Sequence, residues 1–187
     1  MGCNAVNPAL GYALFDTALG RCGLAWGAAG LRAVQLPEVD DAATVARLLR
    51  FSGPCDAAAP TAEAAAAIQG IQALLQGQPL DLCEVRLDMA HLSEFHQRVY
   101  ALTRAIAPGQ VRTYGDMAQA LGGKGLARAV GQALGLNPFA PVVPCHRVLA
   151  AGFHAGGFSA NGGAHTKLRM LQIEGAHWGE TQSLPGF

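Results

Sequence analysis

Residues 111–148 read VRTYGDMAQALGGKGLARAVGQALGLNPFAPVVPCHRV, and this stretch decides the fold of the C-terminal half. Thr113 followed by Asp116 is typical of a capped helix start, and Gly122-Gly123 ends that helix. A second short helix follows directly and ends before Asn137-Pro138. Two short helices joined by a glycine turn predict a helix-turn-helix.

The second helix of this pair carries few long polar side chains. Arg128 and Gln132 lie four residues apart and so share one face, and Lys124 stands just before the helix. Their neighbours on the helix are small residues, namely Ala127, Gly131 and Gly135. A helix that reads bases in the major groove usually presents several long polar side chains, so this one is expected to approach a bulky partner closely instead. A purely structural helix pair is the alternative.

A cysteine with basic neighbours follows the helix pair. The segment 141–144 has a proline at each end of an apolar pair and leads into Cys145, after which come His146 and Arg147. Positive neighbours favour the thiolate, which is the nucleophilic form, so Cys145 is predicted to be reactive. The other four cysteines are interpreted as small buried apolar residues: Cys3, Cys22, Cys55 and Cys83.

Composition excludes several classes of protein. The 187 residues are 51% hydrophobic and 14% charged, which is too apolar for a disordered chain. No run of apolar residues is long enough to span a bilayer, and no secretory leader is apparent, so no membrane contact is expected. Five cysteines, an odd number, argue against a secreted disulfide framework. These features predict a globular cytoplasmic protein.

The net charge of zero hides an asymmetry between the two halves. Residues 1–90 carry five basic and nine acidic groups, a net charge of −4, whereas residues 91–187 carry eight basic and four acidic groups, a net charge of +4. A basic half favours a polyanionic partner, because lysine and arginine displace the counterions of phosphate groups. Chance scatter of surface charge is the alternative interpretation.

The upstream half has an α/β pattern. Apolar periodicity and glycine positions predict a hairpin of two strands, two helices and an edge strand: Gly11–Trp26 with Gly30–Leu36, Asp41–Phe51 with Ala62–Gln76, and Leu80–Leu87. A further helix begins after Ser93 and is expected to end at Pro108-Gly109. We therefore expect an α/β domain at residues 1–88, a mainly α-helical domain with the helix-turn-helix at residues 91–179, and a tail at residues 180–187.

The segment Val111–Gly175 resembles the active-site domain of the O6-alkylguanine-DNA alkyltransferases, also called methylated-DNA–protein-cysteine methyltransferases. The resemblance rests on five pieces of sequence: Val111–Gly115, Ala127–Gly131, Asn137-Pro138, Pro144–Val148, and Lys167 through Glu174-Gly175. It implies a ribonuclease-H-like fold for the N-terminal half and a winged-helix-like fold for the C-terminal domain. It also implies a DNA repair protein that works without a cofactor, as a monomer, on double-stranded DNA.

The resemblance assigns a reaction and roles to individual residues. An O6-alkylguanine would swing out of the duplex, and Cys145 would take its alkyl group irreversibly, so that each molecule turns over once. O4-alkylthymine stays open as a second substrate. His146 would deprotonate Cys145 through a water, Glu174 would orient His146, and Asn137 would support the active-site turn. Tyr114 would donate a hydrogen bond toward the guanine and crowd the backbone phosphate.

Further residues would bind the base and the DNA. Arg128 would fill the gap left by the flipped nucleotide. The carbonyls of Cys145 and Val148 and the amide of Ser159 would read the guanine edge, with Phe158 beside them. The remaining DNA contacts are expected from Gln132 and from three phosphate partners: Arg112, Lys124 and Arg147. The loop Phe158–Gly163 departs from the Tyr-Ser-Gly-Gly-like loop of the family.

A metal site and two other functions, after alkyl transfer as the first reading, were also considered from the sequence. Cys3, Cys22 and His91 could be remnants of a zinc site, but their spacing is not compact, so no metal is predicted. A protein of the same fold that binds alkylated DNA without transfer is the second reading, which the presence of Cys145 disfavours. A Cys-His hydrolase is the third, and the sequence has no clear oxyanion-hole signature for it.

Overall fold

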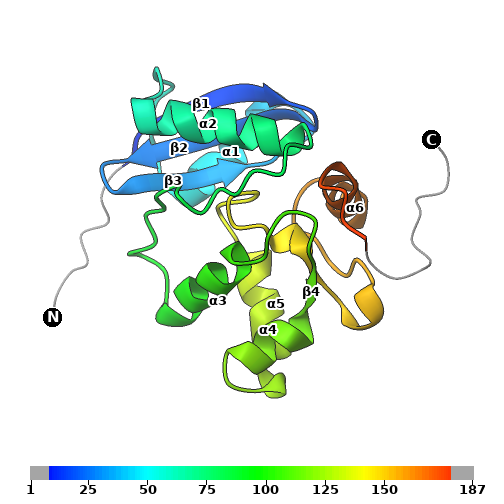
Figure 1. The fold of residues 1–187 in the computed structure, drawn as a ribbon. Coiled ribbons are helices and arrows are strands. Elements are labelled where there is room, and N and C mark those ends of the chain that lie inside the picture. The colour runs from blue at the N-terminus through cyan, green and yellow to red at the C-terminus, as the bar shows by residue number, and fades with distance from the viewer. Residues whose placement is uncertain (1–8, 178–187) are drawn as a thin grey trace, which may run out of the picture.

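A computed structural model describes residues 9–177 of the chain (Figure 1). A small sheet with two helices forms one end of the molecule, and a group of shorter helices forms the other. Within this range no helix is long and apolar enough to cross a membrane. Cys3 and the predicted tail at residues 180–187 lie outside the described residues.

The sheet is an antiparallel meander of β1 (Ala9–Thr17), β2 (Gly20–Gly27) and β3 (Gly30–Gln35). The prediction of one strand over residues 11–26 is therefore wrong, because a tight turn at residues 18–19 divides it. The Thr17 hydroxyl accepts a hydrogen bond from the residue 19 amide and donates one to the carbonyl of the first β2 residue, whose φ of +121° suits glycine. Alanine and leucine are not typical turn residues, so local composition did not indicate this turn.

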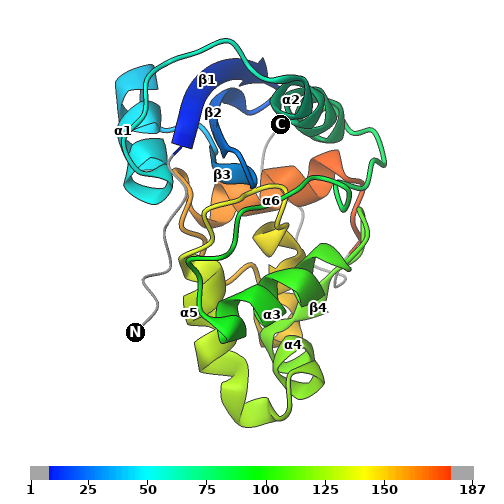
Figure 2. The same cartoon turned by 90° about the vertical axis from the view of Figure 1, so that its left-hand side faces the viewer.

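Helices α1 (Asp41–Ser52) and α2 (Ala62–Leu75) cover opposite faces of the sheet (Figure 2). Leu48 of α1 packs against Ala25, whereas Ile71 of α2 shares a core with Leu24. Neighbouring strand residues point to opposite faces, so Leu24 and Ala25 confirm the two-sided arrangement. Both predicted helices are present, with ends that differ from the prediction by one residue.

The predicted edge strand at Leu80–Leu87 is wrong. This segment is irregular and touches β3 at one place, where Leu31 donates to the Arg86 carbonyl and accepts from the Asp88 amide, both at 2.8 Å. The weak alternation in its sequence has another cause, since its apolar side chains pack against the core from a loop: Leu82, Val85 and Leu87.

Helices α3 (Glu94–Arg104), α4 (Tyr114–Ala120) and α5 (Ala127–Gly135) surround a second core. The predicted caps are confirmed: Ser93 accepts from the third residue of α3, and Thr113 with Asp116 forms a capping box at α4. A 3₁₀ turn at 124–126 leads into α5. Helix α3 ends before the predicted stop at Pro108-Gly109, and the chain then turns so that the side chain of residue 106 enters the core.

A short parallel pairing joins the helix pair to the cysteine motif. β4 (Arg112–Thr113) pairs with β5 (Val148–Leu149), and a 3₁₀ turn at Cys145–Arg147 precedes β5. α6 (Ala164–Ile173) packs against that turn. The Val34 amide of β3 donates to the Pro138 carbonyl at 2.8 Å, so the N-terminal sheet touches the segment that leads to Cys145.

Candidate functional site

Cys145 is held at the start of its 3₁₀ turn by Asn137. The Asn137 amide nitrogen donates to the Val143 carbonyl at 2.8 Å and lies 3.2 Å from the Cys145 sulfur. The Asn137 side-chain oxygen accepts from the amide of Phe139 at 3.0 Å. This one side chain therefore fixes both the backbone before Cys145 and the position of its thiol.

A buried acid–base network lies behind Cys145. His146 is fully buried, and its Nε2 lies 2.8 Å from Oε1 of Glu174. Arg147 donates to both oxygens of Glu174, at 2.8 and 2.9 Å. The fork geometry of arginine suits a carboxylate in this way, so the three side chains form one unit.

The pKa values within this unit follow from burial and from the fixed charge of Arg147. Burial alone would raise the pKa of Glu174, but the hydrogen bonds and charges of His146 and Arg147 lower it to about 2. Burial and the nearby cations lower the pKa of His146, although Glu174 opposes the shift. His146 is therefore a neutral imidazole at pH 7, and its Nδ1 is without a hydrogen-bond partner among residues 9–177. A neutral ring with a free nitrogen is able to accept a proton.

The sequence-based explanation for thiolate formation at Cys145 named the wrong source of positive charge. Burial raises the pKa of Cys145, while the neutral His146 ring and the Arg147 guanidinium both bind Glu174. The interactions that oppose burial are the Asn137 hydrogen bond, the charge of Lys167, and the backbone amides of Cys145 and His146. Arg147 is also 5% exposed, so the expectation that it contacts phosphate is wrong.

Lys167 is a buried cation that the sequence analysis did not assign to the site. It is fully buried on α6, and its Nζ donates to the Val148 carbonyl at 2.6 Å and lies 5.6 Å from the ring centre of Tyr114. Burial lowers its pKa to about 8. The signal for it was available, because Lys167 shares the buried stripe of α6 with Met170 and Leu171.

A cavity of about 550 Å³ opens onto Cys145. The structure brings six predicted site residues to its lining: Tyr114, Arg128, Gln132, Cys145, Phe158 and Ser159. Tyr114 begins α4, and Arg128 and Gln132 lie on α5, so the helix pair forms one wall. The cavity has the size of sites that hold small organic groups.

Other predicted residues lie outside this cavity. Asn137, His146 and Glu174 are buried behind Cys145, and Val148 is buried with its carbonyl accepting from Lys167. Arg112 and Lys124 are exposed on β4 and on the turn before α5. They stand on the same helix-turn-helix unit as Arg128 but not in the cavity wall.

The loop that carries Ser159 is tied to the N-terminal half by Arg47 of α1. One guanidinium nitrogen donates to the Ser159 carbonyl at 2.6 Å, and another lies 3.3 Å from Glu38. Glu38 also accepts from the buried Gln35 side chain at 3.0 Å. This contact has no local signal in the sequence, because its two residues lie 112 positions apart in the chain.

The possible zinc remnant is not assembled within the described part of the chain. Cys22 is buried and its sulfur lies 3.6 Å from the Thr17 hydroxyl, while Cys3 lies outside residues 9–177. Over residues 9–177, no group of three or more histidine, cysteine, aspartate or glutamate side chains is placed to hold a metal ion.

Comparison with known proteins agrees with this geometry. The model of the 6-O-methylguanine DNA methyltransferase DNA-binding domain matches residues 94–176. The chain resembles the solved structure of Mycobacterium tuberculosis OGT in complex with DNA, with 31% identity, a TM-score of 0.71, and coverage of 88% of this chain and 92% of that one. The chain belongs to the O6-methylguanine-DNA methyltransferase family.

Other members of this family match over shorter segments. The methylated-DNA–protein-cysteine methyltransferase of Mycolicibacterium paratuberculosis is 39% identical over 113 residues, which cover 60% of this chain and 66% of that relative. The Salmonella typhimurium protein of the same name is 46% identical over 81 residues, or 43% of this chain and 46% of that relative. The matched segments thus span less than two thirds of these curated relatives.

Proposed function

We propose that this protein repairs DNA by moving the alkyl group of an O6-alkylguanine to Cys145, in a single turnover that consumes the protein. The observation that carries the proposal is the position of Cys145. Cys145 lines a cavity of about 550 Å³, its thiol is held by Asn137, and the next residue, His146, is buried and bound to Glu174. A reactive thiol, a base and an orienting carboxylate are the parts that nucleophilic displacement requires.

The proposed reaction is a proton transfer followed by a nucleophilic displacement. His146 takes the thiol proton on Nδ1, through a bridging water, and Glu174 stabilises the imidazolium that forms. The Cys145 sulfur then attacks the alkyl carbon in line. A carbon–sulfur bond forms, the bond between the alkyl carbon and O6 breaks, and the base leaves with that electron pair as an anion. The anion takes up one proton from water, and the imidazolium of His146 returns the thiol proton to the solvent. The thioether is stable, so no second turnover follows.

The cavity lining supports the base-flipping part of the proposal. A thiol this deeply placed cannot reach O6 inside a base stack, so the nucleotide must enter the cavity. Tyr114 and Ser159 would hold the base, with Phe158 beside it, and Arg128 would occupy the vacated position in the duplex. The Val148 carbonyl already accepts from Lys167, so it would receive the base through its second lone pair.

The DNA contacts outside the cavity are proposed for the helix-turn-helix. Gln132, Arg112 and Lys124 are exposed around the cavity mouth or on the same unit, where they can meet the phosphate backbone. The partner is double-stranded DNA that carries O6-alkylguanine. O4-alkylthymine stays open as a second substrate.

The finer description of the fold is also a proposal. The sheet between α1 and α2 supports a ribonuclease-H-like domain over residues 1–88, and the β4–β5 pairing beside α4 and α5 supports a winged-helix-like domain over residues 91–179. We propose that the protein acts as a monomer in the cytoplasm. The four cysteines within residues 9–177 are free thiols, which is typical of a reducing compartment.

Intact-mass spectrometry after incubation with a duplex that carries O6-methylguanine tests the proposal. We expect one methyl group on Cys145, and no transfer by Cys145→Ala with DNA affinity within about threefold of the parent, because the helix-turn-helix supplies the contacts. Tight binding by the parent without mass gain would indicate the non-catalytic reading. Turnover of an ester would indicate a hydrolase. Methyl uptake by another cysteine in Cys145→Ala would overturn the assignment of the nucleophile.

A further inference from the structure

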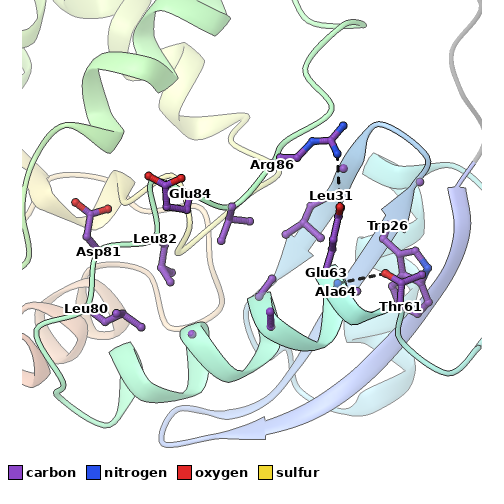
Figure 3. A pocket seen from close by; sticks show the side chains of 16 residues that line it. Trp26, Leu31, Thr61, Glu63, Ala64, Leu80, Asp81, Leu82, Glu84 and Arg86 are labelled. Atoms are coloured by element: carbon purple, nitrogen blue, oxygen red, sulfur yellow. Dashed lines mark hydrogen bonds and ion pairs between the residues drawn. The ribbon is translucent and has the colours of Figure 1, made fainter.

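A second cavity lies in the N-terminal half and shares no lining residue with the cavity at Cys145. It is a cleft of about 400 Å³ between α2 and the loop at residues 80–86 (Figure 3). This volume is within the range of sites that bind organic groups. The mechanism above uses none of its residues.

The cleft has an apolar floor that small residues keep open. Ala67 and Gly70 of α2 line one wall, and Leu82 and Val85 of the loop line the other. Trp26 and Leu31 lie toward one end (Figure 3). A methyl group added at Gly70 would lie 2.8 Å from the Leu82 side chain, so the two walls are already in close contact below the opening. Leu80 is 40% exposed at the rim and extends the apolar surface beyond the cleft.

The rim of the cleft is acidic. Glu63, Asp81 and Glu84 line the cleft together with a single base, Arg86, whose guanidinium lies 3.5 Å from Glu63 and links the two walls. Figure 3 shows the carboxylates of Asp81 and Glu84 at the end of the cleft formed by the loop. Glu84 forms no hydrogen bond or ion pair within residues 9–177. Asp81 accepts from the Cys83 amide at 2.6 Å, so Glu84 is the carboxylate for which a covering ligand must supply positive charge, because burial of an unpaired charge is costly.

The cleft lies away from the proposed DNA surface. In both views of the ribbon, α2 is at the end of the molecule opposite to α4 and α5 (Figures 1 and 2). Its acidic rim would repel phosphate, so nucleic acid is excluded as the occupant. A ligand here would therefore bind without competing with DNA.

We propose that this cleft docks a segment of a partner protein that presents one large apolar side chain next to a lysine or arginine. The apolar side chain fills the space between Ala67 and Leu82, where an aromatic residue buries about 150–250 Å². The basic neighbour pairs with Glu84 and Asp81 at the rim. The partner's backbone on either side of this apolar side chain would cover the exposed Leu80, which a small free cation could not do. A central apolar anchor with a polar rim is the usual anatomy of such contacts.

A fluorescence-polarisation titration of the full chain with a labelled peptide tests this proposal. The probe is Gly-Gln-Lys-Phe-Lys-Gln-Gly, and the comparison peptides replace Phe by Ala or both Lys by Glu. We expect each change in the peptide to weaken binding by about tenfold or more. Amide shifts in a ¹⁵N spectrum should concentrate at Gly27, Gly30 and Gly70, which line the cleft.

Matched variants of the protein locate the site. Ala66 is exposed and lines the cleft, so Ala66→Phe should fill it and weaken binding about tenfold or more, whereas Gln69→Phe on the same helix does not face the cleft and should have no effect. Glu84→Gln should weaken binding about threefold, and Glu94→Gln on α3 should not. Alkyl transfer should be unchanged in all four variants, which separates this proposal from the proposed function.

Three outcomes would overturn the proposal. Equal affinity of Ala66→Phe and the parent would place the peptide elsewhere. Displacement of the peptide by phenethylammonium alone, at the same concentration, would identify a site for small cations. A dimer in sedimentation that Ala66→Phe dissociates would identify a second copy of this chain as the occupant.

Discussion

The two sides of Cys145 differ in how their polar groups are satisfied. On one side of the thiol, called the closed side below, His146, Arg147 and Glu174 are buried and bound to one another. On the other side, called the open side below, Arg128 and Gln132 line the cavity and are exposed. Their side chains have no hydrogen bond or ion pair within residues 9–177. Under the proposed function, the groups that do chemistry are positioned before DNA arrives, and the groups that contact DNA keep their bonding capacity for it. The predictions below change one side at a time.

The largest effect is expected from Glu174→Gln, which removes the charge that compensates Arg147. A buried cation without its partner destabilises a fold by about 3–5 kcal/mol, so the free energy of unfolding should fall by that amount, with loss of alkyl transfer. The pKa of Glu174 is lowered to about 2, so its stabilisation is full above the ordinary carboxyl pKa and is lost as pH falls from about 4.5 toward 2. Urea unfolding from pH 7 to pH 2.5 measures both effects.

The control for Glu174→Gln is Glu94→Gln, which changes an exposed carboxylate at the start of α3. It should cost less than about 1 kcal/mol, since an acidic side chain in the first turn gains only that much from the helix dipole. In Glu174→Gln the acid-dependent loss between pH 4.5 and 2.5 should be smaller than in the parent. If both variants keep the parental acid profile, the buried network does not control acid stability.

Arg128→Ala changes the open side and should slow repair of a duplex about 10- to 100-fold. Extrusion of a base costs a few kcal/mol, and an inserted guanidinium recovers part of that by stacking on the neighbouring bases. The free base O6-benzylguanine needs no extrusion, so its rate should change less than about twofold. Stopped reactions with both substrates at one salt concentration provide the comparison.

Arg50→Ala is the matched control, because it removes an equal charge from an exposed position on α1. It should leave both rates near those of the parent. An equal fall on both substrates in Arg128→Ala would mean that Arg128 supports the cavity or the fold and not the vacated position in DNA.

Lys167→Met probes the closed side through the thiol pKa and should have a smaller effect. The charge of Lys167 lowers the pKa of Cys145, so its removal should shift the rate–pH profile toward higher pH and lower the rate at pH 7 about tenfold. In the parent, the pKa of Lys167 is about 8, so this help is present below pH 8 and fades above it. Lys124→Met, the exposed counterpart, should leave the profile unchanged. An unshifted profile in Lys167→Met would show that Asn137 and the backbone amides of Cys145 and His146 offset burial without the lysine charge.

Local sequence signals predicted the helices and their caps but not the connections between distant segments. The capping box at Thr113 and the start of α3 after Ser93 depend on residues a few positions apart, and both are confirmed. The turn at residues 18–19 has no typical turn residues, and the segment Leu80–Leu87 alternates because it packs as a loop. These two errors arise where tertiary packing decides the structure.

The site shows the same division. A cysteine motif after a helix pair predicted the location of the nucleophile and the residues of one cavity wall. Glu174 sets the direction in which the His146 and Arg147 side chains point. It lies 28 positions from His146 and 27 positions from Arg147 along the chain. The charge of Arg147 was therefore assigned to Cys145 although its guanidinium binds Glu174, and the role of buried Lys167 was missed.

The smallest effect is expected from Arg47→Ala, which tests whether the N-terminal half supports the open side. Arg47 binds the Ser159 carbonyl at 2.6 Å and Glu38 at 3.3 Å, and it is partly exposed, so its loss should cost little stability. Without Arg47, the Ser159 loop would sample more conformations, and a smaller share of them would hold the base correctly. Transfer should slow about two- to fivefold, to the same extent for the duplex and for O6-benzylguanine, because both substrates use the loop. That equal fall is the opposite of the pattern expected for Arg128→Ala. Arg47→Lys keeps the charge but not the fork that reaches both partners, so its rate should lie between those of the parent and Arg47→Ala. A rate for Arg47→Ala equal to that of the parent on both substrates would show that the loop is positioned by the C-terminal half alone.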